Sequence, residues 1–316
     1  MEKQPENEEI RGWFLVGPTA SGKSGVAHLL AERWNVPILS ADAMAVYRQM
    51  DVGTDKPTAD MRKRVHYEGI DLADPSESFS VGRYLSAVRE KLTALAGPYI
   101  VVGGTGLYIS ALLYGLDPMP PEDPSVRAEW EAVLSREGPS ALREALRARA
   151  PELLAAMDDP DNPRRLIRAL EWAAAGVRKP PETWNRFRGR VLVAGIRRNR
   201  EELAHRIERR VHTMYARGLL EEARRLLERP GGLSKTARMA IGYAEAFDVL
   251  AGRSTLEEAM MRTIVRTRRL AKRQRTWFAH QVRVEWVDVT ETQSRETIAD
   301  NIAEVWERSG PVPIRL

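Results

Sequence analysis

The side chains best suited to chemistry lie near the N-terminus, in a full match to the phosphate-binding pattern G-x-x-x-x-G-K-[ST]. The match consists of Gly17, Pro18, Thr19, Ala20, Ser21, Gly22, Lys23 and Ser24. In such a loop the glycines let the backbone curl so that successive N–H groups face an anion, while Lys23 adds a positive charge and the Ser24 hydroxyl can ligate Mg²⁺. The pattern therefore predicts a site for a di- or triphosphate, the ligand class to which ATP and other nucleotides belong.

Three further side chains could act on whatever the loop holds. Asp42 follows a short apolar run, where an aspartate can be a general base, a Mg²⁺ ligand or the N-cap of the segment after it. Arg206 and Arg210 are one helical turn apart and project together. Two guanidinium groups at this spacing could clamp a diphosphate, or they could form ordinary surface ion pairs with Glu202 or Glu208. The pattern alone leaves both interpretations open.

The elements that position these residues follow an α/β pattern. Apolar runs at 13–16, 37–40 and 99–102 predict short buried strands, and the first leads through the phosphate loop into a predicted helix at 22–32. A second glycine cluster, at 103–106, follows the third run. Ligands bind at the carboxyl ends of the strands in open parallel sheets, so these segments are expected at one edge. The expected fold is a P-loop NTPase-like α/β core, with a mostly parallel sheet flanked by helices.

Two proline-rich stretches, at 116–124 and 176–181, break helix and strand alike and mark boundaries. The chain between them is rich in Ala, Leu, Arg and Glu at helical spacing. We therefore expect a core domain of residues 1–118 and 191–316, interrupted by an all-helical insertion domain at 119–190. The remaining expected elements are strands at 67–72, 191–196 and 282–289 and helices at 80–96, 107–114, 200–217, 221–228, 236–250, 256–278 and 297–308.

Composition sets further limits. The chain has 316 residues, 43% of them hydrophobic, and no cysteine, which excludes disulfides, thiolate catalysis and Cys-ligated zinc. No apolar stretch approaches the roughly 20 residues of a membrane span, so we expect a cytoplasmic protein that does not contact a membrane. The net charge of +5 is concentrated in residues 197–278, where 20 basic and 10 acidic residues leave +10. Such a region beside a phosphate loop indicates a polyanionic partner, although a solvated helical surface can have the same composition.

Three segments are candidates for contact with nucleic acid. The segment 261–278 carries seven cations and no acid, which fits binding of a phosphate backbone; the alternative is a solvated face whose cations meet acids from elsewhere. In the insertion, Arg164 and Arg168 lie on one face of a helix predicted to begin near 162. The segment 238–243 joins a cation, a glycine and an aromatic residue, which suits a loop that stacks or splays a base. The seven cations are Arg262, Arg266, Arg268, Arg269, Lys272, Arg273 and Arg275.

Taken together, seven stretches resemble the tRNA dimethylallyltransferase (tRNA isopentenyltransferase) family, in its shorter bacterial form without a zinc finger. They run in family order over most of the chain: GPTASGKS (17–24), SADAMAVYRQMDVGTDKP (40–57), VVGGTGLYI (101–109), NPRRLIRALE (162–171), RIERRV (206–211), AIGYAE (240–245) and TRRLAKRQRTWF (267–278). The resemblance implies transfer of the dimethylallyl group from dimethylallyl diphosphate to N6 of the adenosine next to the anticodon in tRNA. The phosphate loop and Mg²⁺ would hold the diphosphate, which leaves.

The resemblance also implies roles for individual residues. Asp42 would accept the N6 proton, Arg206 would stabilise the leaving diphosphate, and Ser24 with Thr19 would help to hold the diphosphate and the metal. The tRNA contacts would come from Asp42, Ala43, Met44, Ala45, Thr105, Arg127, Arg164, Arg165, Leu166, Ile167, Arg168, Arg238, Met239, Ala240, Ile241, Gly242 and Tyr243. The adenosine would be flipped into a channel, because N6 is inaccessible in a stacked loop. We expect a monomer that binds the anticodon stem-loop of tRNA.

One position departs from the family pattern: many members have Ser directly after the aspartate, whereas this chain has Ala43. A hydroxyl contact there is put in doubt, although the expected base is not. Three other activities stay open: prenyl transfer to free adenine nucleotides, phosphoryl transfer by a small-molecule kinase, and RNA binding regulated by a nucleotide without catalysis. The long insertion and the +10 region argue against a mononucleotide acceptor, which needs no such surface.

Binding to tRNA is predicted to weaken steeply with salt, because each phosphate contact made by the cations at 262–275 releases counterions. If six of these cations bind phosphates, the affinity falls roughly 10³-fold between about 50 and 200 mM salt. Fluorescence anisotropy of labelled tRNA at several salt concentrations measures this slope. A flat dependence would show that the segment is a solvated face.

Overall fold

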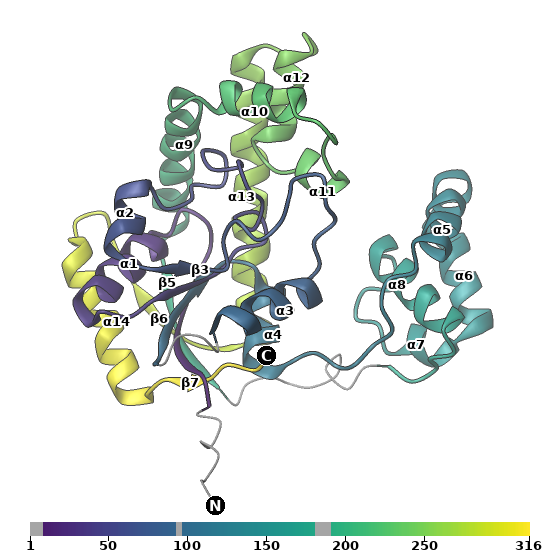
Figure 1. Ribbon diagram of the computed structural model, residues 1–316, viewed down its shortest axis with the longest axis horizontal. Coiled ribbons are helices and arrows are strands. Elements are labelled where there is room, and N and C mark those ends of the chain that lie inside the picture. Colours follow the sequence, from purple (N-terminus) through teal and green to yellow (C-terminus); the bar gives the residue numbers. More distant parts are fainter. Residues whose placement is uncertain (1–8, 93–96, 181–190) are drawn as a thin grey trace, which may run out of the picture. The chain divides into compact units, whose positions relative to one another are not determined.

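The computed structural model describes residues 9–92, 97–180 and 191–316 (Figure 1). By its internal contacts the chain divides into two compact units, Met1–Gly115 with Arg188–Leu316, and Leu116–Phe187. The sequence places the same two boundaries about three residues further on, at 118/119 and 190/191. The last four residues of the helix expected at 80–96 lie outside the described residues.

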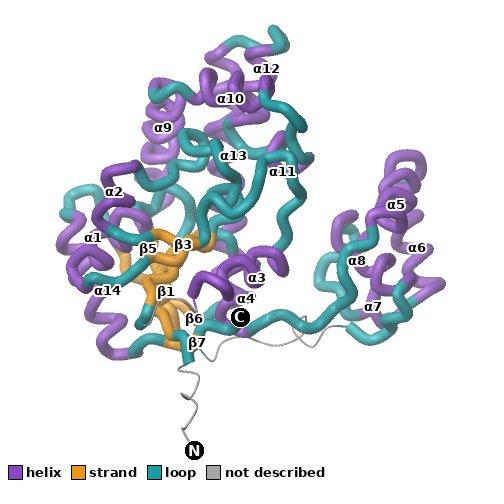
Figure 2. The backbone as a smooth tube through the Cα atoms, in the orientation of Figure 1, coloured by secondary structure: helices purple, strands orange, loops and turns teal. Residues whose placement is uncertain are grey.

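The first unit is built on a seven-stranded sheet, whose strands are orange in Figure 2. The strand order is β3-β2-β4-β1-β5-β6, and β7 pairs with the start of β1. All pairs are parallel except the one between β1 and β7, which confirms the expected mostly parallel sheet. The strands are β1 (Arg11–Val16), β2 (Ile38–Ala41), β3 (Tyr67–Glu68), β4 (Tyr99–Gly103), β5 (Leu192–Arg197), β6 (Arg283–Asp288) and β7 (Val312–Pro313).

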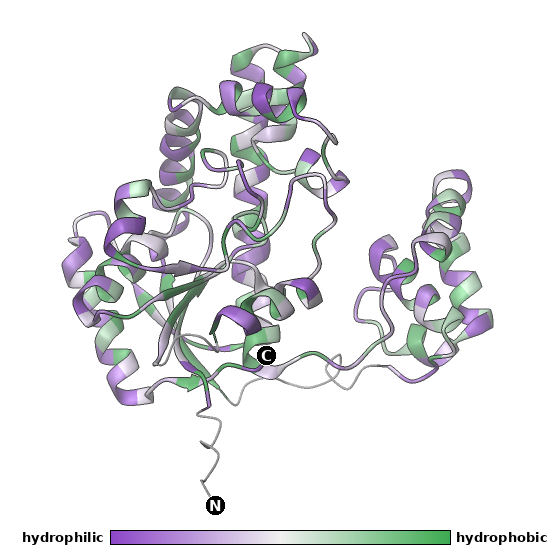
Figure 3. Cartoon of the chain, in the orientation of Figure 1, coloured by the Kyte–Doolittle hydropathy of each residue, from purple (hydrophilic) through white to green (hydrophobic). Residues whose placement is uncertain are grey.

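Alternation of apolar side chains along the strands produces two hydrophobic cores, one on each face of the sheet. In β1, Phe14 and Val16 belong to one core and Leu15 to the other, as the two-residue period of a strand requires. Figure 3 shows hydrophobic residues along the central strands and a mixture of hydrophobic and hydrophilic residues along the surrounding helices. Helices α1 (Lys23–Trp34) and α14 (Arg295–Ser309) cover the Leu15 face. The other face is covered by α3 (Val81–Leu92), α4 (Gly106–Tyr114), α9 (Arg200–Ala216) and α13 (Leu256–Gln281).

Three shorter helices and α2 (Ala59–Arg64) complete the first unit: α10 (Leu219–Glu228), α11 (Lys235–Arg238) and α12 (Tyr243–Leu250). The prediction of one continuous helix at 236–250 is wrong, because Gly242 has φ 92° and breaks the chain into α11 and α12. The strand expected at 67–72 is only two residues long. None of the described helices is both long enough and apolar enough to cross a membrane.

All described elements of the second unit are helices: α5 (Pro124–Glu137), α6 (Pro139–Arg149), α7 (Pro151–Ala155) and α8 (Pro163–Ala174). Each begins with a proline, a residue that suits the first helical position because its missing N–H would have no partner there. The prolines that interrupt the helical pattern in the sequence are therefore helix starts. The helices share a small core of their own, which includes Trp130, Leu142, Leu146 and Leu166.

A buried carboxylate, Glu222 of α10, anchors the loop that follows β2. It accepts hydrogen bonds from the backbone N–H groups of Asp51 at 3.1 Å, Val52 at 3.0 Å and Gly53 at 3.3 Å. The hydroxyl of the buried Tyr243 in α12 donates a further hydrogen bond to Glu222. One charged group thus ties the 51–53 backbone to two helices, and its charge is compensated by four donors.

The hydroxyl of Tyr243 is predicted to stabilise the fold. Changing Tyr243→Phe leaves the buried Glu222 carboxylate with one donor fewer, which should reduce the free energy of unfolding by about 1–3 kcal/mol. The matched control is Tyr47→Phe: Tyr47 is also fully buried, but its hydroxyl has no hydrogen-bond partner in the described part of the chain. Urea denaturation of both variants measures the difference, and equal changes would contradict this role for Glu222.

Candidate active site

Three parallel strands end at the same level and bring their loops to one edge of the sheet. Gly103, the last residue of β4, pairs with Val16 of β1 on one side and with Ala41 of β2 on the other. The phosphate loop, the turn at Asp42 and the turn at 104–105 therefore begin next to one another. This is the edge at which parallel α/β sheets bind ligands, as expected from the sequence.

The phosphate loop has the conformation and the open donors of an anion site. Ala20 has φ 64° and Gly22 has φ 96°, so the backbone reverses direction immediately before α1 begins at Lys23. No side chain caps the N-terminus of α1. The hydroxyl of Ser21 is fully buried and has no hydrogen-bond partner among the described residues. Unused donors at a helix N-terminus are what a phosphate group binds.

Lys23 places a buried cation beside Asp42. Its Nζ donates to the carbonyl oxygen of Pro18 at 3.3 Å. Burial lowers the pKa of Lys23 to about 8; the nearby Asp42 carboxylate opposes this shift, and Arg210 adds to it. The charge of Lys23 is therefore held in the site at neutral pH without the solvent that would otherwise stabilise it.

Three arginines bind the loop from its open side. Arg206 donates from Nε to the carbonyl oxygen of Ala20 at 2.9 Å, and Arg198 donates from Nε to that of Ser21 at 2.9 Å. Arg210 donates to the Thr19 hydroxyl at 3.0 Å. Burial, followed by the neighbouring Arg198, lowers the pKa of Arg206. These cations surround the same anion site as Lys23.

The two interpretations of Arg206 and Arg210 can now be compared. Glu202 forms its ion pair with Arg198, and Glu208 lies 3.5 Å from Arg268. Neither acid pairs with Arg206 or Arg210. Arg206 forms no ion pair with a described residue and contacts the phosphate loop, whereas Arg210 contacts the loop and also lies 3.7 Å from the carboxylate of Asp55. The geometry therefore favours the clamp for Arg206, and Arg210 combines the loop contact with an ion pair to another acid.

One carboxylate oxygen of Asp42 accepts hydrogen bonds from the turn that follows it, and the other oxygen is free of hydrogen bonds to described residues. Its Oδ1 accepts from the N–H groups of Met44 at 2.8 Å and Ala45 at 3.4 Å, so the side chain caps a turn at 43–46, and no helix follows it. Its Oδ2 makes no hydrogen bond within the part of the chain that the structure describes. The N–H of Ala43 donates to the Thr105 hydroxyl at 2.9 Å, which ties this turn to the start of α4. Asp42 can thus accept a proton without losing its cap.

The residues present also fit a Mg²⁺ ion bound together with a diphosphate. No cluster of three or more histidines or carboxylates that could hold a metal occurs among the described residues. Ser24 lies exposed in the first turn of α1, three residues after Ser21. Mg²⁺ usually binds to one or two protein ligands together with substrate phosphate oxygens and water. The Ser24 hydroxyl occupies the position of the phosphate-loop motif that ligates Mg²⁺.

The candidate RNA contacts of the insertion differ in exposure. Arg164 and Arg165 are exposed, whereas Leu166 and Ile167 are buried in the core of the second unit. Arg127 forms a two-point ion pair with the buried Glu171, at 2.8 and 3.0 Å, and Arg168 joins the same carboxylate at 2.9 Å. The side chains of Leu166 and Ile167 therefore serve packing, and Arg127 and Arg168 hold the helices together.

The residues of the segment 238–243 also differ in exposure. Arg238 and Met239 are exposed, Ile241 is half-buried, and Ala240 and Gly242 are buried. Tyr243 is fully buried, with its ring packed in the core of the first unit and its hydroxyl on Glu222. A stacking role for this tyrosine is therefore incorrect, because no face of the ring is accessible to a base.

The basic segment of α13 is partly neutralised. Arg262 pairs with Asp248 at 3.0 Å, Arg268 lies 3.5 Å from Glu208, and Arg266 pairs with Glu245. The other four cations are exposed and form no ion pair with any described residue; they are Arg269, Lys272, Arg273 and Arg275. The interpretation in which cations meet acids from elsewhere is thus confirmed for three of the seven residues. Binding of a phosphate backbone stays a prediction for the four unpaired cations.

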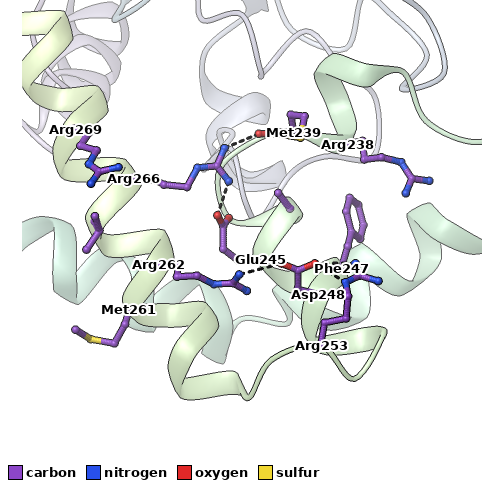
Figure 4. Close-up of a pocket in the computed structure, with 12 residues that line it drawn as sticks. Arg238, Met239, Glu245, Phe247, Asp248, Arg253, Met261, Arg262, Arg266 and Arg269 are labelled. Carbon is purple, nitrogen blue, oxygen red and sulfur yellow. Dashed lines mark hydrogen bonds and ion pairs between the residues drawn. The ribbon is translucent and has the colours of Figure 1, made fainter. Parts of the chain in front are cut away.

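A pocket of about 680 Å³ lies between α12 and α13, away from the phosphate loop. In Figure 4, Arg266 points toward Glu245 and the backbone of Met239, whereas Arg238 and Arg269 stand apart from the acids drawn. Met239 is 56% exposed and contributes apolar surface to the same pocket. Cationic and apolar groups together suit an unstacked nucleotide.

Sequence reasoning missed two residues of this site. Arg198 directly follows β5, so inspection of the carboxyl end of every predicted parallel strand would have found it. Gln274 accepts from the N–H of Thr19 at 2.8 Å and donates to the carbonyl oxygen of Gly104 at 2.9 Å. It is the uncharged residue in the basic run 272–275, a signal too weak to use without the contacts.

Comparison with known proteins gives consistent results. A model of the family described as IPP transferase matches residues 45–281, and a model described as isopentenyl transferase matches residues 10–68. A tRNA dimethylallyltransferase of Corynebacterium efficiens is 40% identical over 87% of this chain and 93% of its own length. The tRNA dimethylallyltransferase of Thermus thermophilus is 43% identical, over 84% of this chain and 89% of its own.

Two solved structures of transferases are also similar to this chain. The full-length tRNA isopentenylpyrophosphate transferase of Bacillus halodurans is 36% identical, with a TM-score of 0.66 over 95% of this chain and 98% of that one. A eukaryotic dimethylallyltransferase acting on tRNA is 22% identical, with a TM-score of 0.72 over 96% of this chain and 81% of that one, and this likeness concerns the fold alone.

The anion site is predicted to lose affinity as the pH rises through about 8, because Lys23 loses its proton there. The measured quantity is the affinity for inorganic diphosphate, relative to that of the matched variant Lys23→Arg, which keeps its charge. The affinity of the unchanged protein divided by that of Lys23→Arg should fall roughly tenfold at a pH one unit above the pKa of Lys23. A constant affinity ratio would contradict a charged Lys23 in the site.

The stability of the free protein should rise between about pH 8 and 10.5, because in this range the unfolded chain binds a proton that the folded chain has lost.

Proposed function

The chain belongs to the IPP transferase family, and we propose that it transfers the dimethylallyl group of dimethylallyl diphosphate to N6 of the adenosine next to the anticodon in tRNA. It is a prenyltransferase, and diphosphate is the second product. The observation that carries the proposal is the meeting of three features at one sheet edge: the phosphate loop, the cations that surround it, and an aspartate with an open oxygen.

The reaction needs a leaving group that is stabilised and an amine that loses a proton. The N6 nitrogen attacks the first carbon of the dimethylallyl group, and the bond from that carbon to the diphosphate oxygen breaks. The electron pair of this bond leaves with the diphosphate, and the N6 proton passes to Oδ2 of Asp42. No phosphoryl group is transferred, so the loop serves to hold a leaving group.

Charge is the main contribution of the protein to this step. Lys23, Arg198 and Arg206 are fixed by hydrogen bonds to the loop before any ligand binds, so they need little rearrangement as negative charge develops on the diphosphate. Mg²⁺ would be held by Ser24 together with the diphosphate oxygens, and it would supply further positive charge to the leaving group. Thr19 is oriented by Arg210 and lies at the same site.

The acceptor is a tRNA, which supplies a phosphate backbone to the unpaired cations of α13. The target adenosine is flipped out of the anticodon loop to reach the open oxygen of Asp42. The turn at 42–45, held by Thr105, receives this base. Arg164 and Arg165 in the insertion, and Arg238 and Met239 in the first unit, are exposed side chains that contact the same RNA. We expect the protein to act as a monomer on the anticodon stem-loop.

Mass analysis of tRNA after incubation with dimethylallyl diphosphate and Mg²⁺ tests this function. The expected product is an adenosine that carries one dimethylallyl group, next to the anticodon. Preference for AMP as acceptor would overturn the choice of substrate, and transfer of a γ-phosphate without prenylation would establish a kinase instead.

Asp42→Asn is predicted to abolish most turnover while tRNA binding is retained. An asparagine can still cap Met44 and Ala45 through Oδ1, but it cannot accept the N6 proton. A positioned general base contributes roughly 10²–10⁴-fold, so kcat should fall by that factor. Asp42→Ala removes the cap as well and should also loosen the turn. Activity of Asp42→Asn close to that of the unchanged protein would exclude Asp42 as the base.

A further inference from the structure

Helix α13 lies directly on two of the three loops at the active-site edge, the phosphate loop and the turn at 104–105. A Cβ atom added to Gly104 would stand 2.4 Å from Nε2 of Gln274, and one added to Gly106 would stand 2.3 Å from the Trp277 ring. A larger residue at Gly106 would force the Trp277 ring to shift, and one at Gly104 would displace the Gln274 amide. The close approach shows that the turn after β4 is shaped to receive this part of α13 (Figure 1).

At this contact the side chain of Gln274 joins the turn at Gly104 to the phosphate loop. Its side-chain oxygen accepts from the N–H of Thr19 at 2.8 Å, and its side-chain nitrogen donates to the carbonyl oxygen of Gly104 at 2.9 Å. Both hydrogen bonds together require an amide: a carboxylate of the same length could only accept, and an ammonium group could only donate. The identity of this side chain is therefore specified by the site.

The two loops that Gln274 joins carry different parts of the chemistry. On one side, Thr19 belongs to the loop that holds the diphosphate, and Arg210 binds its hydroxyl. On the other side, Gly104 precedes Thr105, whose hydroxyl accepts from the N–H of Ala43, the residue after Asp42. A single side chain thus connects the group that holds the leaving group with the turn that holds the proton acceptor.

Gln274 also lies within the cationic segment of α13. Its neighbours in the chain include Lys272, Arg273 and Arg275, which are exposed and form no ion pair within the described ranges. A polyanion bound to these cations acts on the same helical turn that carries Gln274. The side chain that contacts the phosphate loop and the cations available to a polyanion therefore lie on the same turn of α13.

We propose that Gln274 is a positioning residue that holds the phosphate loop at the correct place relative to Asp42, and that it transmits RNA binding on α13 to the diphosphate site. The proposal rests on the proposed function, because it takes the RNA to be the acceptor. It assigns no contact between Gln274 and a substrate. Its consequence is that RNA and diphosphate strengthen each other's binding through this amide.

The test uses the full chain and the variants Gln274→Met and Gln274→Glu. Calorimetry measures the affinity for inorganic diphosphate with and without an anticodon stem-loop RNA. In the unchanged protein the RNA should raise this affinity about tenfold, within the usual range of coupling between two sites. In Gln274→Met the increase should fall below about twofold, and kcat for prenyl transfer should fall at least about tenfold, while the affinity for the stem-loop RNA measured without diphosphate stays the same.

Gln274→Glu keeps the acceptor for Thr19 but loses the donor to Gly104, and it adds a negative charge. It should therefore weaken diphosphate binding even without RNA. The matched control is Gln293→Met, because Gln293 also accepts a backbone N–H, that of Thr290 at 2.9 Å, but in the turn before α14. This control should behave like the unchanged protein in every assay. Urea denaturation confirms that each variant is folded.

Two results would overturn the proposal. One is a Gln274→Met variant with an unchanged kcat and unchanged coupling. The other is an unchanged protein in which RNA has no effect on diphosphate affinity. Failure of the proposed function is a separate outcome: the unchanged protein would then not prenylate tRNA at all, whereas the effect of Gln274→Glu on diphosphate binding, measured without RNA or a prenyl group, would persist.

Discussion

The site depends on the register of three parallel strands. Gly103 pairs with both Val16 and Ala41, so β1, β2 and β4 end at one level. The phosphate loop, the turn of Asp42 and the turn at Thr105 therefore emerge together, and hydrogen bonds of Thr105 and Gln274 can join them. A shift of one strand by a single residue would separate these loops and turn every side chain of that strand to the other face.

The same edge collects positive charge that the fold does not neutralise. Lys23 and Arg206 are held by carbonyl oxygens of the loop and form no ion pair with a described residue, and burial lowers the pKa of both side chains. Arg198 is held in the same way, but Glu202 neutralises its charge. Buried cations without a full complement of acids reduce stability in the free protein. An anion with several negative charges, such as the diphosphate of the proposed substrate, would compensate them.

Much of the fold follows from the sequence, because the local period of apolar residues predicts strands and helices. The strand at 13–16, the phosphate loop and the helix after it lie where the pattern predicts them, as does the long helix that carries the basic segment. Predictions from local patterns were wrong where a contact with a residue distant in the sequence decides the structure. The helix expected at 236–250 is broken at Gly242, and Tyr243 turns inward because the distant Glu222 needs a hydrogen-bond donor.

By itself the sequence determined the family and the α/β class, and it predicts the ligand class, since a phosphate loop is a short contiguous motif whose chemistry resides in neighbouring residues. Only the tertiary structure decided which cations serve the site. Arg198 and Gln274 lie about 180 and 255 positions after the loop that they bind. Arg262, Arg266 and Arg268 meet acids from other helices, whereas four cations of the same helix do not. Pairing between charges depends on distance in space, which the order of residues does not contain.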